Sequence, residues 1–146
     1  MITPLLVGAL LLIVSVVFSA MACSLIVRIM IAMLQRGYAG DYFLGNVMLM
    51  VITVLIATAD HLFLIGVWAI ALMLCGEFTD FNRAYYHSAG NYTTLGYGDI
   101  VMSDRWKLLG PLEAINGVLL IGLFTALLFA VLNRLVEQRL KLREGS

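Results

Sequence analysis

The stretch "NYTTLGYGDI", residues 91–100, interrupts a chain that is otherwise strongly apolar. Its two glycines stand on either side of a tyrosine, and glycine readily adopts backbone angles that are strained for other residues. Long apolar runs lie on both sides of the stretch. What such a polar, glycine-containing loop can be therefore depends on the segments that surround it.

The composition of the chain is that of a membrane protein. Of its 146 residues, 62% are hydrophobic and 12% are charged, and the formal net charge is zero. The mean hydropathy of +1.01 excludes an ordinary soluble domain. A transmembrane helix needs about 20 mostly apolar residues, and residues 5–27, 43–74 and 108–132 each meet this need. The sequence predicts three transmembrane helices and leaves no room for a soluble domain.

The segment between the second and third apolar runs predicts a re-entrant loop. Thr79 or Asp80 can cap a short helix over residues 80–92, and the glycine-containing residues 93–99 follow directly. Irregular backbone at membrane depth is tolerated only where it is buried in protein or lines water. We therefore expect this loop to line a water-filled path.

Lys and Arg are unevenly distributed among the connecting segments. Arg28 and Arg36 flank the end of the first apolar run, and four basic residues follow the third run, whereas residues 76–107 contain three. Because positive residues are enriched on the cytoplasmic side, we expect a cytoplasmic carboxyl terminus. Three spans then place the amino terminus and residues 76–107 outside.

The run "TTLGYGD", residues 93–99, is similar to the selectivity-filter signature of potassium channels, T-x-G-Y-G. "KLLGPLEAINGVLLIGL", residues 107–123, resembles the inner helix of voltage-gated-type potassium channels and of small bacterial relatives. The resemblance extends over residues 62–135. It implies an all-α membrane protein with three transmembrane helices plus a re-entrant pore helix and filter, in the tetrameric potassium-channel pore architecture. It also implies a bacterial inner (plasma) membrane and passive conduction rather than enzyme catalysis.

The resemblance places K+ against backbone oxygens of the filter. The filter residues are Thr93, Thr94, Leu95, Gly96, Tyr97, Gly98 and Asp99, and the K+ ligands are Thr94, Leu95, Gly96 and Tyr97. A dehydrated cation needs replacement oxygens, which backbone carbonyls supply when they face one axis. One chain supplies one wall, so we expect a homotetramer in the lipid bilayer. Permeant K+ is the expected ion, with no organic cofactor and no nucleic acid partner.

Three residues are candidates for supporting the filter. Tyr86 and His87 stand where many relatives carry a tryptophan pair, and the resemblance allows a hydrogen bond between Tyr86 and Asp99. The alternative is that these rings only pack and anchor the outer interface; His87 could also make the outer mouth pH-sensitive. We interpret Glu113 as a buried, hydrogen-bonded brace rather than a permeation group.

The third apolar run contains the expected gate. Gly117 matches the hinge glycine of the family, and Ile121 and Thr125 follow on the same helical stripe and would line the cavity. Phe129, beyond them, could close the cytoplasmic mouth by dewetting. The alternative is that Gly117 and Gly122 only permit close packing of helices.

Asp60 and His61 lie near the middle of the second apolar run, where an ionisable residue is costly. Ser15 and Ser19 lie at a similar depth in the first run, so an antiparallel neighbour would bring them level with Asp60. We expect a structural clasp of interhelical hydrogen bonds. The alternative is a proton-sensing gate.

The expected organisation is a peripheral transmembrane helix over residues 1–36, a pore module over residues 41–135 and a cytoplasmic tail over residues 136–146. Within the pore module we expect an outer helix over 43–75, the pore helix over 80–92, the filter over 93–99 and an inner helix over 105–135. Three other functions remain open: a weakly selective cation channel, a proton-coupled transporter that uses Asp60, His61 and Glu113 as a relay, and a non-conducting subunit that assembles but passes no current. A channel depends on Gly96, whereas a relay does not.

Overall fold

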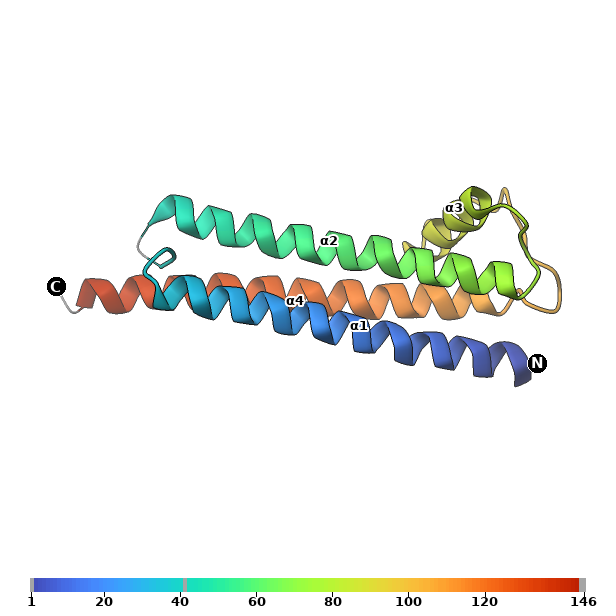
Figure 1. Cartoon of the computed structure of the whole chain (residues 1–146), viewed down its shortest axis with the longest axis horizontal. Coiled ribbons are helices and arrows are strands. Elements are labelled where there is room, and N and C mark those ends of the chain that lie inside the picture. Colours follow the sequence, from blue (N-terminus) through green and yellow to red (C-terminus); the bar gives the residue numbers. More distant parts are fainter. Residues whose placement is uncertain (1, 41, 145–146) are drawn as a thin grey trace. The chain divides into compact units, whose positions relative to one another are not determined.

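The computed structural model describes residues 2–40 and 42–144, which form four helices (Figure 1). Three are long: α1 (Ile2–Gln35), α2 (Phe43–Leu74) and α4 (Leu109–Glu144). The fourth, α3 (Phe81–Tyr92), is short and precedes the loop that returns to α4. The regular structure of the described residues is helical throughout. The prediction of an all-α protein with three long apolar helices and one short helix is confirmed.

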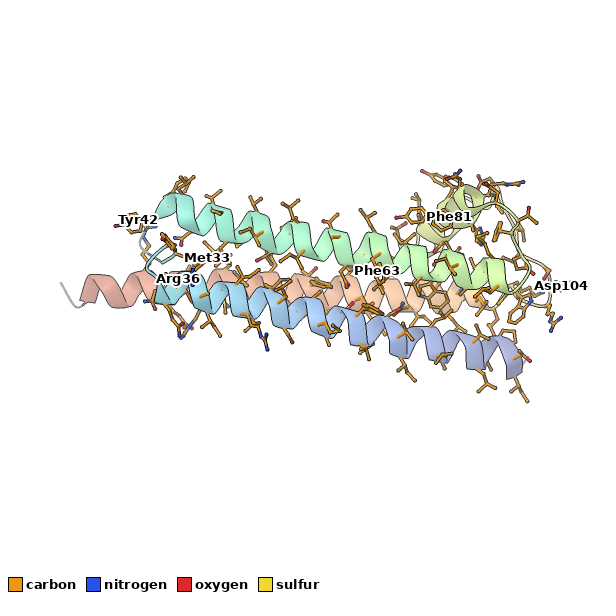
Figure 2. All side chains as sticks on the ribbon, viewed as in Figure 1. Met33, Arg36, Tyr42, Phe63, Phe81 and Asp104 are labelled. Carbon is orange, nitrogen blue, oxygen red and sulfur yellow. The ribbon has the colours of Figure 1, made fainter. Side chains whose placement is uncertain are left out.

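The long helices carry exposed apolar side chains along their length (Figure 2). Examples on α1 and α2 are Leu10, Ile13, Val17, Leu55 and Phe63. Each long helix is sufficiently long and apolar to cross a membrane. Apolar surface of this extent is suited to contact with lipid. The protein is therefore an integral membrane protein with three candidate spans.

The short helix α3 begins at a polar cap. The carboxylate of Asp80 accepts a hydrogen bond from the amide of Arg83 at 2.9 Å. This bond satisfies one of the amide groups that a helix leaves unpaired in its first turn. Of the two caps that the sequence allowed, Thr79 and Asp80, the structure uses Asp80.

One compact unit contains the first part of α1, through Ser19, together with Asp60–Ile121. Its core includes the buried side chains of Leu11, Leu64, Trp68, Leu72, Tyr92 and Leu109. The sequence led us to expect α1 as a peripheral helix outside the pore module. Its first part, through Leu11, instead shares a core with α3.

The second compact unit contains Ala20–Ala59 and the chain from Gly122 onward. Its core is built from Ile26, Leu49, Phe124, Val131 and Leu135. The turn between α1 and α2 is closed by Asn46, whose side chain accepts from the Gly40 amide at 2.7 Å and donates to the Gly40 carbonyl at 3.3 Å. The end of α1, this turn and the start of α2 therefore all belong to the second unit.

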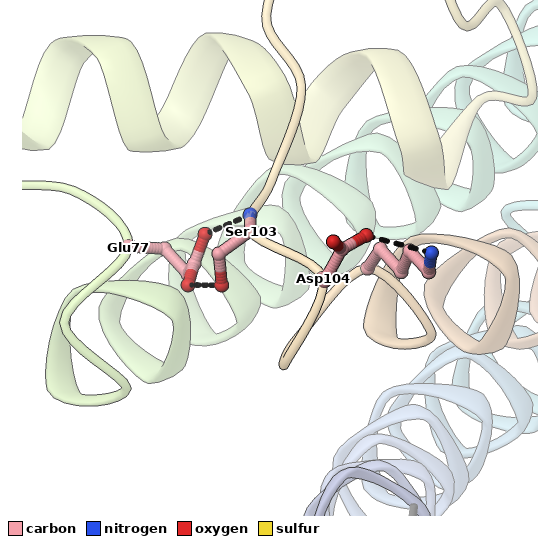
Figure 3. A network of polar contacts seen from close by, with 4 residues as sticks. Glu77, Ser103 and Asp104 are labelled. Carbon is pink, nitrogen blue, oxygen red and sulfur yellow. Dashed lines mark hydrogen bonds and ion pairs between the residues drawn. The ribbon is translucent and has the colours of Figure 1, made fainter.

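Helix α4, which the sequence led us to expect as the inner helix, begins at Leu109, whereas the sequence placed its start at residue 105. The intervening residues form a turn, in which Lys107 Nζ lies 2.8 Å from Asp104 Oδ1 (Figure 3). In the same connection, Glu77 accepts hydrogen bonds from the amide of Ser103 at 2.8 Å and from its hydroxyl at 2.5 Å. The two Glu77 contacts tie the connection after the loop to the residues that follow α2.

Candidate functional site

The filter segment, which we define as residues 93–99, starts in the C-terminal cap of α3. The amide of Thr94 donates to the carbonyl of Asn91, and the amide of Leu95 donates to that of Gly90, both at 2.9 Å. These bonds form a Schellman motif, in which the left-handed position is usually glycine. Here Thr94 occupies that position, with φ 60°. The end of α3 therefore determines how the filter segment begins.

Positive φ angles alternate along the filter segment. Thr94, Gly96 and Gly98 have φ angles of 60°, 50° and 75°, whereas Leu95 and Tyr97 between them do not have positive φ. A Cβ at Gly96 or Gly98 would meet no atom within 4 Å. Glycine is therefore favoured at these two positions by the backbone conformation and not by lack of space.

The first carbonyl groups of the filter segment face away from α3. The amides of Leu95 and Gly96 both donate to the carbonyl of Gly90, at 2.9 and 3.1 Å. In a trans peptide the carbonyl of the preceding residue points opposite to the amide, so the carbonyls of Thr94 and Leu95 point outward. The whole filter segment is exposed in the single chain, including the side chains of Leu95 (58%) and Tyr97 (67%).

Glu113 of α4 is fully buried and reaches α3. Its carboxyl group contacts the hydroxyl of Ser88 and accepts from Asn91 Nδ2 at 3.3 Å. Ser88 also donates to the carbonyl of Ile65 in α2, at 2.9 Å. The side chains of Ser88 and Glu113 thus join α3 to both long helices beside it. This is the geometry of a buried brace.

Tyr92, the last residue of α3, is contacted by two long helices. Its hydroxyl lies 3.0 Å from His61 Nδ1 of α2. Its carbonyl oxygen lies so close to Gly117 of α4 that an added Cβ would overlap it. Burial raises the pKa of the Tyr92 phenol, so the hydroxyl stays neutral. The residue directly before the filter segment is therefore held between α2 and α4.

An ion-channel family profile matches residues 60–134, just over half of the chain. The matched region contains α3, the filter segment and the residues that contact Tyr92. The chain belongs to the ion channel family. This confirms the expected class of protein, a channel and not an enzyme. No curated protein and no solved structure matches the channel significantly.

Tyr86 of the channel lies beside the far end of the filter segment. Its ring stacks on that of Tyr97, with centroids 6.4 Å apart and planes 4° apart. Partial desolvation raises the pKa of Tyr86, as do a hydrogen bond with Asp99 and the charge of that carboxylate. A pocket of about 360 Å³ lies between α3 and the filter segment, and Tyr86, Tyr97 and Asp99 are among its lining residues. Tyr86 and Asp99 thus line the same pocket, at the place where the resemblance allowed a hydrogen bond between them.

His87 faces the end of α3 and the connection that precedes this helix. Its Nε2 lies 3.1 Å from Asn91 Nδ2, and its ring packs against Phe78 with centroids 5.2 Å apart. Burial lowers the pKa of His87, and the charges of Asp99 and Glu77 oppose this shift. His87 is therefore biased toward its neutral form.

The expected gate residues of the channel follow one another at intervals of four along α4, on one helical face. Gly117 is closely packed, whereas a Cβ at Gly122 would meet no atom within 4 Å. Ile121, Thr125 and Phe129 are exposed in the single chain. The structure therefore gives Gly117 a packing contact that Gly122 lacks.

The polar clasp around Asp60 is only partly as expected. Ser19 Oγ donates to Asp60 Oδ2 at 2.7 Å, but Ser15 accepts from Asn116 Nδ2 at 2.9 Å instead.

Sequence reasoning also missed Ser88. A signal for it existed, because Ser88 lies four residues before Tyr92 and so on the same face of the short helix.

Proposed function

We propose that the channel is selective for potassium and conducts it passively through the carbonyl oxygens of Thr94, Leu95, Gly96 and Tyr97. The observation that carries this proposal is the alternation of positive φ along the filter segment. Together with the amides tied to α3, it favours carbonyls that share one direction. Such carbonyls can replace the hydration shell of a cation.

The proposed channel is a homotetramer. One filter segment forms one wall, and four walls around an axis are needed to surround an ion. The exposure of Leu95 and Tyr97 in the single chain supports this assembly, because neighbouring copies would cover them. Ile121, Thr125 and Phe129 would then line the path from the filter to the cytoplasm, where apolar side chains can close a pore by dewetting.

The distribution of Lys and Arg supports an external filter and a cytoplasmic carboxyl terminus in this proposal. Membership of the ion channel family favours passive conduction over a proton-coupled transporter. The contacts of Glu113 with Ser88 and Asn91 also favour a structural role for this carboxyl group over a place in a relay. A weakly selective cation channel remains the nearest alternative. The following experiment separates the two, because a weakly selective channel would also conduct sodium.

The test is ion flux through purified channel in liposomes, under gradients of potassium, rubidium and sodium. We expect potassium and rubidium flux with little sodium flux. Gly96→Ala should abolish flux or make it unselective, because alanine is strained at φ 50°. Gly122→Ala is the matched control, since Gly122 has no positive φ and has open space for a Cβ.

Equal flux of sodium and potassium in the wild type would support the weakly selective channel instead. Unchanged selectivity in Gly96→Ala would refute the carbonyl filter. Flux that depends on a proton gradient and on Asp60, with Gly96 dispensable, would indicate the transporter.

A further inference from the structure

Helix α1 makes two hydrogen bonds with polar side chains buried in the unit that contains the filter segment. Ser19 Oγ donates to Asp60 Oδ2 of α2 at 2.7 Å, and Asn116 Nδ2 of α4 donates to Ser15 Oγ at 2.9 Å. All four side chains are buried. The donors and acceptors are compatible, since Ser15 gives its own proton to the carbonyl of Leu11 at 2.8 Å.

The two partners of α1 are the immediate neighbours of the residues that contact Tyr92. Asp60 precedes His61, which lies at the Tyr92 hydroxyl, and Asn116 precedes Gly117, which lies at the Tyr92 carbonyl. Consecutive residues of a helix are separated by a fixed rotation of about 100°. A rotation of α2 or α4 that broke a bond to α1 would therefore also displace a contact of Tyr92.

We propose that Ser15 and Ser19 are positioning residues for the selectivity filter, acting through the segments of α4 and α2 that hold Tyr92. The region that matches the ion-channel family begins at residue 60, so the family match assigns no role to α1. The proposal rests on the proposed potassium filter. It makes the first part of α1 a component of the ion-conducting unit.

Hydrogen bonds are suited to this role in a membrane. Lipid tails are as apolar as leucine, so apolar contacts between helices discriminate weakly among rotations of a helix. A hydrogen bond between buried polar groups has defined partners and geometry. Ser15 and Ser19 therefore specify the rotation of α4 and α2 more sharply than the apolar packing around them.

The test compares Ser15→Ala, Ser19→Ala and the double variant with Ser24→Ala, an exposed serine of the same helix. The readout is the potassium-to-sodium permeability ratio of tetrameric channel in liposomes. From the energy of interhelical hydrogen bonds in membranes, we expect the ratio to fall about threefold in each single variant and about tenfold in the double variant. Ser24→Ala should keep the wild-type ratio, and Ser19→Thr, which retains the hydroxyl, should restore most of it.

A lower yield or total flux with an unchanged permeability ratio in both single variants would overturn the proposal, because it would show a structural role alone. If the double variant does not assemble, the single variants and Ser19→Thr decide the matter. A wild type without preference for potassium would refute the proposed function itself. A selective wild type with equally selective serine variants would refute only the role of α1.

Discussion

The carbonyl oxygen of Tyr92 lies against Gly117 with no room for a side chain between them. The contact joins the end of α3, from which the filter segment continues, to the helix that we propose as the inner wall of the pore. From the sequence, Gly117 could be a hinge or a packing residue. The structure supplies a packing reason for glycine at this position, and any bending of α4 there would be transmitted to Tyr92.

Gly117→Ala should therefore destabilise the channel. The added methyl group must displace the Tyr92 backbone, and overpacking of this kind costs about 1–3 kcal/mol. We expect a lower midpoint of thermal unfolding in detergent, together with reduced potassium flux. Gly122→Ala is the control, because alanine fits there and favours the helix. Equal stability of the two variants would contradict the close contact.

Glu113→Gln should preserve the channel, and Glu113→Ala should not. Ser88 has one hydroxyl proton and donates it to Ile65, so the Glu113 contact is best satisfied when Glu113 itself donates. A glutamine amide can donate to Ser88 and accept from Asn91. Alanine removes a hydrogen-bond partner from the buried Ser88 and from the half-buried Asn91, at a cost of about 1–3 kcal/mol.

The measurement is thermal unfolding and potassium flux of the two Glu113 variants side by side. If glutamine were as damaging as alanine, the ionised carboxylate would be the form that matters, and the brace would be the wrong interpretation of this residue.

Much of the fold was predictable because it depends on local features of the sequence: the length and apolar composition of each run and the positions of the glycines. Three runs of sufficient length predicted α1, α2 and α4, and Asp80 marked the start of α3. The start of α4 was misplaced because residues 104–108 form a turn next to Ser103, whose amide and hydroxyl are bound by Glu77, a residue distant in the sequence.

Contacts between elements distant in the sequence were harder to predict. The depth of Ser19 in the first apolar run correctly predicted its contact with Asp60, because this prediction requires only two antiparallel helices of similar length. Depth could not separate Ser15 from Ser19, because the choice of partner depends on the rotation of each helix. The close approach of Tyr92 to Gly117 likewise depends on tertiary packing that no periodicity reveals.

The stability of the channel should decrease as the pH falls below the ordinary pKa of histidine, and His87 should account for part of this decrease. Burial lowers the pKa of His87 from its ordinary value of 6.5. The unfolded chain then binds more protons than the folded chain in mildly acidic solution, so stability rises with pH in this range. The contribution of His87 is complete above pH 6.5 and is lost as the pH falls through its folded pKa.

The measurement is thermal unfolding at several values between about pH 5.5 and pH 7.5, a range in which most carboxylates stay ionised, for the wild type and His87→Gln. The variant should lose less stability over this range than the wild type, because glutamine does not titrate. Parallel curves for the two proteins would assign the acid sensitivity to other groups, and His61→Gln would be the next variant to compare.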